Sequence, residues 1–416
     1  MKQLFLFECK KILRRKSTWI ALLGVLAFML FLTGMRAAQI SRIDRDGKEL
    51  SGLAAIALTR EQAAVWEGPL TADKLAEALA IYQNAQLDPD NLISGESGET
   101  YLSDAAYAVY AQPNAELHNL IRRTFSPVGN YNYFILDDLS RKDMEQFYAV
   151  RMQKTEEVLN REYTDGNLSE AERSFFRELN AKVQQPYHFA YIEGWEHIVE
   201  LFSTAVLAIA FVLCVCLSPL FALEYQTGAD SVILSSRYGK SRIITAKLLA
   251  SLCFTTVVYW IGTLLFAGFF LLAFGTDGWN ASLQILSLTA PFSLTMWEAC
   301  LLGGLLGYLV ILSVMAAIVL LSALLRTPFA AIITSALWLF VPLFLPSSKI
   351  HGVYNHILAL LPGKAADTIT AFGIYSAYDF WGNVVSLPTM IAVVSLLFVA
   401  MVPPFVYRGF RKHQVV

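Results

Sequence analysis

The chain has 416 residues, of which 56% are hydrophobic and only 16% are charged, and its formal net charge is −2. An ordinary soluble domain has roughly 45–50% apolar and about 25% charged residues, so this composition excludes a protein that is soluble throughout. Its basic clusters are short and lie beside apolar stretches, which argues against binding to nucleic acid.

Apolar residues are concentrated in six stretches, each close to the roughly 20 residues that a helix needs to cross a bilayer. They predict an all-α integral membrane protein with six transmembrane helices. The predicted spans are residues 19–35, 196–220, 243–274, 299–325, 329–345 and 384–407, so that spans three to five fill residues 243–345. A long segment, residues 36–195, separates the first two spans and is large enough to form a domain with its own core.

Charged residues are segregated along the chain. The N-terminal tail, the loops after the second and fourth spans and the C-terminal tail, residues 408–416, hold 14 Lys and Arg residues against three acidic residues. Residues 37–195 hold 15 Lys and Arg against 25 Asp and Glu, a net charge of −10. By the positive-inside rule, we expect a multi-pass protein of the cell membrane with both termini in the cytoplasm and an extracellular domain at residues 36–195.

The N-terminal tail, residues 1–18, mixes apolar side chains with six Lys and Arg residues. Such a segment can form an amphipathic helix in the cytoplasmic headgroup layer, with its cations towards anionic lipid. It can equally be an ordinary basic flank of the first span, and the residues alone leave both interpretations open.

The extracellular domain is expected to be mainly helical. Residues 71–86 place apolar side chains on one helix face, with Thr71 as a capping residue. Residues 142–163 form a second candidate helix, and residues 169–183 form a third that opens with a capping box. A second external segment, residues 346–383, is rich in aromatic residues and is expected to be re-entrant or helical at the outer interface.

The loop after the second span, residues 221–242, has charged ends and an apolar turn. This pattern predicts a short cytoplasmic helix that docks on a partner, although a solvated basic loop is the alternative. The residues that carry the interpretation are Glu224, Gly228, Leu234, Arg237, Lys240 and Lys247. Its Gly-Lys-Ser tripeptide, residues 239–241, is not a P-loop, because Leu234 stands where that motif requires a glycine.

Ionisable residues near the membrane are candidates for function. Glu196 and Glu200 lie one helical turn apart at the outer end of the second span, and Glu298 lies at the outer end of the fourth. They can line an exit for a cationic substrate or form interfacial ion pairs. Gly303 and Gly307 have the small-xxx-small spacing for close helix contact, within one subunit or between two.

The order of these elements resembles that of the permease subunits of type-2 ABC exporters. In that family the loop after the second span carries a Glu, a Gly four residues later, an apolar stretch, a basic residue and a Lys that leads into the next span. Glu224, Gly228, Leu234, Lys240 and Lys247 occupy those positions here. The resemblance implies that residues 1–18 form an interface helix and that residues 221–242 contain the coupling helix that contacts an ATPase.

The resemblance also implies a function: outward movement of a substrate, such as a peptide, antibiotic or lipid, driven by ATP. The partners would be two ATPase subunits on separate chains, which bind ATP and magnesium, together with a second permease copy, identical or homologous, and membrane lipid. The chain itself is expected to have no catalytic residues, cofactor or metal site. The alternative is a non-transporting sensor or immunity protein that binds a cationic peptide through its acidic external domain.

Overall fold

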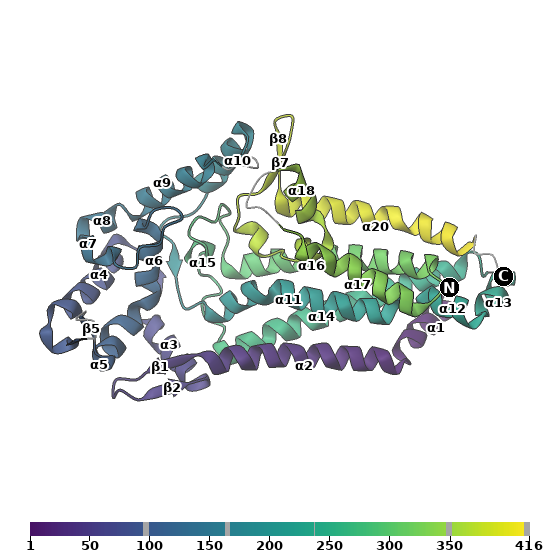
Figure 1. Ribbon diagram of the computed structural model, residues 1–416, viewed down its shortest axis with the longest axis horizontal. Helices are drawn as coiled ribbons and strands as arrows, with labels where there is room; N and C mark the ends of the chain where they lie inside the picture. Colours follow the sequence, from purple (N-terminus) through teal and green to yellow (C-terminus); the bar gives the residue numbers. More distant parts are fainter. Residues whose placement is uncertain (95–99, 163–166, 237, 347–351, 412–416) are drawn as a thin grey trace.

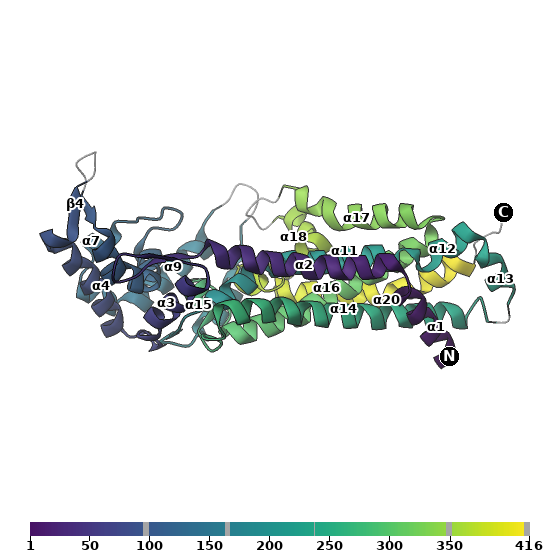
Figure 2. The ribbon, with the colours of Figure 1, turned by 90° about the horizontal axis from the view of Figure 1, so that it is seen from below.

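The computed structural model describes residues 1–94, 100–162, 167–236, 238–346 and 352–411. It has a long helical bundle and, at one end of it, a separate body of mainly helical structure, here called the head domain, residues 40–192 (Figure 1). The first helix, α1 (Lys2–Leu13), and the last described turn of α20 (Leu387–Arg411) lie at the opposite end, here called the terminal end (Figure 2).

Five helices of the described chain are long and apolar enough to cross a membrane. They are α2 (Lys16–Gln39), the consecutive pair α11 (Glu193–Leu217) and α12 (Pro219–Thr227), α14 (Arg242–Phe274), α16 (Met296–Leu324) and α20. The predicted fifth span falls on α17 (Pro328–Phe344), whose 17 residues are fewer than the roughly 20 needed to cross a bilayer. The protein is thus a mostly helical membrane protein, whereas the predicted count of six spans is not confirmed.

The centre of the bundle is formed by α11 and α16, which pack against each other and against α14. Small residues allow α16 to approach its neighbours closely. A Cβ atom added at Gly303 would lie 2.3 Å from Ile369 Cγ1, and one added at Gly307 would lie 2.6 Å from Tyr259 Oη. Both neighbours belong to this chain, so the two glycines serve packing within one subunit here.

In its described residues, the head domain is built from short helices and three small two-stranded sheets. Its helices are α3 (Leu53–Ala64), α4 (Ala72–Leu87), η1 (Pro89–Asn91), α5 (Asp104–Ala106), η2 (Tyr107–Ala111), η3 (Gln112–Asn114), α6 (Ala115–Phe125), α7 (Ile135–Asp138), α8 (Arg141–Glu145), α9 (Phe147–Asn160) and α10 (Glu170–Ala181). Its antiparallel strand pairs are β1 (Ser41–Ile43) with β2 (Glu49–Ser51), β3 (Gly68–Pro69) with β6 (His188–Phe189), and β4 (Leu92–Ser94) with β5 (Thr100–Leu102).

Two of the predicted helices of this domain are confirmed. The Thr71 side chain accepts a hydrogen bond from the Lys74 N–H at the start of α4, and α10 begins with a capping box between Ser169 and Glu172. The predicted single helix at residues 142–163 is wrong. Gln146 has φ −91° and ψ 2°, outside the α-helical region, so the chain bends there and forms α8 and α9.

Two arginines fasten the head domain to the loop between α14 and α16, which contains the short helix α15 (Leu283–Leu286). The Arg123 guanidinium donates hydrogen bonds to the carbonyl oxygens of residues 285 and 286, at 2.7 and 2.8 Å. Arg151, which is fully buried, donates to the carbonyl oxygens of residues 288 and 290 at 3.1 and 3.2 Å. Because bonds from a charged donor are strong, this loop and the head domain are expected to move together.

The last connection leads from α17 back to α20 and combines short helical segments with one hairpin. It contains α18 (Val353–Leu360), α19 (Pro362–Ala365), η4 (Thr370–Phe372) and a hairpin of β7 (Ala377–Phe380) with β8 (Asn383–Ser386). α19 packs against both α16 and α17, and the hairpin touches α10 of the head domain. This connection therefore joins the bundle to the head domain.

Candidate functional site

The candidate site lies at the terminal end of the bundle, where α12 is followed by a short helix, α13 (Ala229–Ser235) (Figure 1). α12 ends at Thr227 because Gly228 adopts a left-handed conformation, with φ 69°. The chain turns there, and α13 projects beyond the bundle. One apolar side chain of α13, Val232, is 72% exposed, whereas Ile233 and Leu234 are half-buried against the core.

A buried ionic network lies directly behind α13. Lys247, in the first turns of α14, is completely buried, and its ammonium group contacts three oxygen atoms. It donates to Glu224 Oε1 at 2.6 Å, to Glu8 Oε2 at 3.1 Å and to the carbonyl oxygen of residue 220 at 2.7 Å. A buried ammonium group is tolerated when it is paired and its donors are used, and all three donors of Lys247 are used here.

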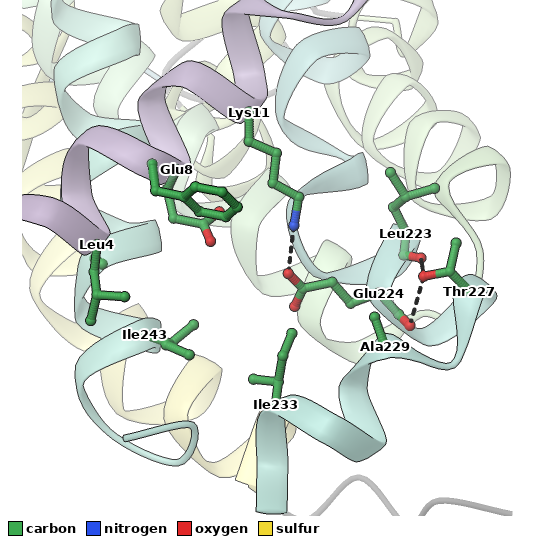
Figure 3. A pocket seen from close by; sticks show the side chains of 11 residues that line it. Leu4, Glu8, Lys11, Leu223, Glu224, Thr227, Ala229, Ile233 and Ile243 are labelled. Atoms are coloured by element: carbon green, nitrogen blue, oxygen red, sulfur yellow. Dashed lines mark hydrogen bonds and ion pairs between the residues drawn. The ribbon is translucent and has the colours of Figure 1, made fainter. Parts of the chain in front are cut away.

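The N-terminal helix α1 supplies the rest of this network. Lys11 donates to the same Glu224 Oε1 at 2.6 Å, as Figure 3 shows. The network therefore holds two ammonium groups and two carboxylates, which balance in charge. It links α1 to α12 and α14 through three ion pairs.

A cavity of about 420 Å³ opens beside the network, between α1, α12, α13 and α14 (Figure 3). Most of its wall is apolar, from residues such as Leu4, Leu223 and Ile243. Glu224 also lines it. The second oxygen of that carboxylate, Oε2, is buried and has no hydrogen-bond partner among the described residues. A buried acceptor usually has a partner, so this oxygen is an exception among the buried polar atoms of the site.

The predicted coupling residues fall into two groups in the structure. Glu224 and Lys247 are buried within the ionic network, so neither offers its charge on the surface. Gly228 forms the turn between α12 and α13, Leu234 is half-buried on α13, and Lys240 is exposed, with its carbonyl oxygen accepting a hydrogen bond from Arg411 Nε at 2.6 Å. Arg237 lies outside the described residues. Their role in coupling stays a prediction.

Sequence reasoning did not select Glu8 and Lys11 as site residues. A signal for Glu8 was present, since it is the one acidic residue among the six Lys and Arg residues of the N-terminal tail. No comparable signal marks Lys11, which is one of six Lys and Arg residues in this tail.

The three acidic residues predicted to line a substrate mouth have different partners in the structure. Glu200 pairs with Arg36 at 2.6 Å, and Glu196 is half-buried on the same helix. Glu298 accepts hydrogen bonds from the backbone N–H and hydroxyl of Thr295 and so caps its own helix. In the described part of the chain, no group of three or more His, Cys, Asp or Glu side chains could hold a metal ion.

A comparison with models of protein families matches residues 4–410 to the family described as ABC-2 family transporter protein. The match extends over nearly the whole chain, from α1 to the last turn of α20. Comparisons with curated proteins and with solved structures gave no match.

Proposed function

This chain belongs to the ABC-2 transporter family and is the permease component of an ABC transporter; we propose that it exports a substrate with energy from ATPase subunits on separate chains. ATP and magnesium would bind to two such ATPases. A second permease copy would complete the pathway through the membrane. These details go beyond the family, and the arrangement at the terminal end supports one part of them, the docking of an ATPase.

The observation that carries the proposal is the joining of an exposed helix to a buried network. α13 offers an apolar surface at Val232 and lies at the end of the bundle that holds α1 and the end of α20. The carboxylate of Glu224, one turn before α13, is bonded to α1 and α14. A push on α13 would therefore be transmitted to α12, α1 and α14 together, because the charged contacts that join them are short and mostly buried.

The cavity beside Glu224 supports the same proposal. Its mostly apolar wall suits a projecting apolar side chain of an ATPase. Docking would bury Val232 as well. When ATP draws the two ATPases together, the docked α13 helices of two permeases would move with them and rearrange the spans.

Copurification from native membranes in mild detergent tests the proposal. The wild-type chain should bring an ATPase with it in about equal amount. Val232→Asp should remain in the membrane but lose the ATPase, since a carboxylate would be buried at the contact. Val65→Asp is the matched control, because Val65 is 77% exposed but lies in the head domain, at the other end of the molecule.

Two results would contradict the proposal. The first is that Val232→Asp keeps the ATPase as well as Val65→Asp does. The second is that the wild-type chain carries no ATPase under conditions that preserve other transporter complexes, which would favour the sensor interpretation.

A further inference from the structure

The β7–β8 hairpin ends in an unusual turn. Phe380 pairs with Asn383, so the turn consists of Trp381 and Gly382 alone. Both have positive φ, at 53° and 90°, as a two-residue turn of type I′ requires. Asn, Asp and Gly normally fill the first of these positions, and a bulky residue there is uncommon.

The Trp381 side chain has no packing that explains its presence at this strained position. It is 99% exposed, the highest value among the exposed large apolar residues of the described chain. A large aromatic residue that is almost fully exposed in a strained turn points to a contact outside the protein.

The hairpin belongs to a larger apolar surface. The Tyr378 hydroxyl donates to the carbonyl oxygen of His356 on α18 at 2.8 Å, and the two rings lie 4.6 Å apart. α18 thereby stands beside the hairpin, with Val353, Tyr354 and Ile357 exposed by 76%, 53% and 59%. At the tip, Phe380 adds a further exposed aromatic ring.

The position of this surface identifies its partner. β8 ends at Ser386 and the apolar span α20 begins at Leu387, so the base of the hairpin lies at the end of a membrane span. Figure 1 shows the hairpin projecting sideways from the bundle, across its long axis, rather than outward along that axis. The tip therefore stays near the depth at which α20 leaves the lipid.

The one acidic residue of the hairpin has both of its carboxylate oxygens hydrogen-bonded within the chain. Asp379 accepts hydrogen bonds from the Ser169 hydroxyl and from the Gly382 N–H, both at 2.7 Å. The first of these bonds also ties the hairpin to the start of α10 in the head domain. A carboxylate satisfied in this way does not oppose burial of the neighbouring rings in lipid headgroups.

We propose that the β7–β8 tip and the exposed face of α18 form a lipid anchor, which binds the membrane surface at the head-domain end of the bundle. Trp381 and Phe380 would lie at the level of the headgroups, the depth that amphipathic aromatic rings prefer. Through the Asp379–Ser169 bond, the anchor would hold the head domain at a fixed distance from the lipid. The proposal needs only the membrane location of the chain and is independent of ATPase docking.

Fluorescence quenching in lipid vesicles tests the anchor. Trp381→Cys is labelled with an environment-sensitive fluorophore, and the full chain is reconstituted in phosphatidylcholine vesicles. Part of the lipid carries a nitroxide near the headgroup end of its acyl chain. Gln86→Cys, at the exposed end of α4 in the head domain, is the matched control, and the labelled wild-type chain gives the background from its own cysteines, such as the exposed Cys253.

The proposal predicts that nitroxide lipid removes most of the emission at position 381 and leaves position 86 unchanged. Iodide in the water should have the opposite effect. Equal quenching of both positions by iodide, with none by the lipid, would overturn the anchor. So would protection of position 381 from both quenchers, because that result means that protein, such as a second copy of the chain, covers the tip.

Discussion

Replacing Lys247 with methionine removes the central cation of the buried network while keeping most of the side-chain volume. Two carboxylates and one carbonyl group would lose the ammonium donor that now lies 2.6–3.1 Å from each. Removing one partner of a buried ion pair typically costs about 3–5 kcal/mol, because the other charge stays buried without compensation. Lys11 can still pair with Glu224, so Glu8 should be the group left unpaired.

This assignment predicts a rescue. In the double variant Lys247→Met with Glu8→Leu, the pair of Lys11 and Glu224 remains and the network is balanced again. The two changes should therefore be strongly non-additive, with a coupling energy of about 1–3 kcal/mol in favour of the double variant. Denaturant titration in detergent micelles of the wild type, the two single variants and the double variant gives the complete cycle.

Lys10→Met is the matched control, since Lys10 lies on the same helix α1 but is exposed. It should change the free energy of unfolding by no more than about 0.5 kcal/mol. If Lys247→Met were as mild as Lys10→Met, or if the double variant lost the full sum of the single losses, the network would not be the ionic unit inferred from the distances.

Three further predictions concern the head domain, the packing of α16 and the orientation. Burial lowers the pKa of His118 to about 4; the unfolded chain takes up a proton near pH 6.5 and the folded chain does not. The contribution of His118 to the free energy of unfolding should therefore be complete above about pH 6.5 and should fall by about 1.4 kcal/mol per pH unit towards pH 4. Unfolding of the wild type and of His118→Gln should be compared across that range. The free energy of unfolding should fall less steeply with pH in the variant. Gly303→Ala should destabilise the bundle by about 1–3 kcal/mol through its clash, whereas Gly304→Ala, with nothing within 4 Å of the added Cβ, should be neutral or up to about 1 kcal/mol more stable in the same denaturant titration. On intact cells, an impermeant thiol reagent should label Gln86→Cys but reach Ser235→Cys on α13 only after permeabilisation; the reverse pattern would show that the head domain is cytoplasmic.

The helices that could be predicted are those marked by signals within their own sequence, such as a long apolar stretch or a capping residue. A span must satisfy its own backbone hydrogen bonds in lipid, so an apolar stretch of sufficient length is nearly enough to locate it. α4 and α10 likewise begin where Thr71 and Ser169 cap them. The break at Gln146 escaped prediction because no Gly or Pro marks it, and the strand pairs escaped because they are only two to four residues long.

The candidate site was predictable in its residues but not in its geometry. The loop pattern selected Glu224 and Lys247, which the structure does bring together, at 2.6 Å. It did not show that both are buried, since a Lys before an apolar span is usually solvated or turned towards headgroups. The contact of Lys247 with Glu8 joins positions that are 239 residues apart, and no spacing rule reaches that far.

Site-specific photo-crosslinking from α13 tests whether this helix docks on an ATPase. A photoreactive amino acid is placed at Val232 or, as a control, at Val65, and native membranes are irradiated before the adducts are identified by mass spectrometry. Position 232 should link to an ATP-binding protein, and position 65 should not. Adducts at position 232 only with lipid or with this chain itself would contradict the claim that α13 docks on an ATPase.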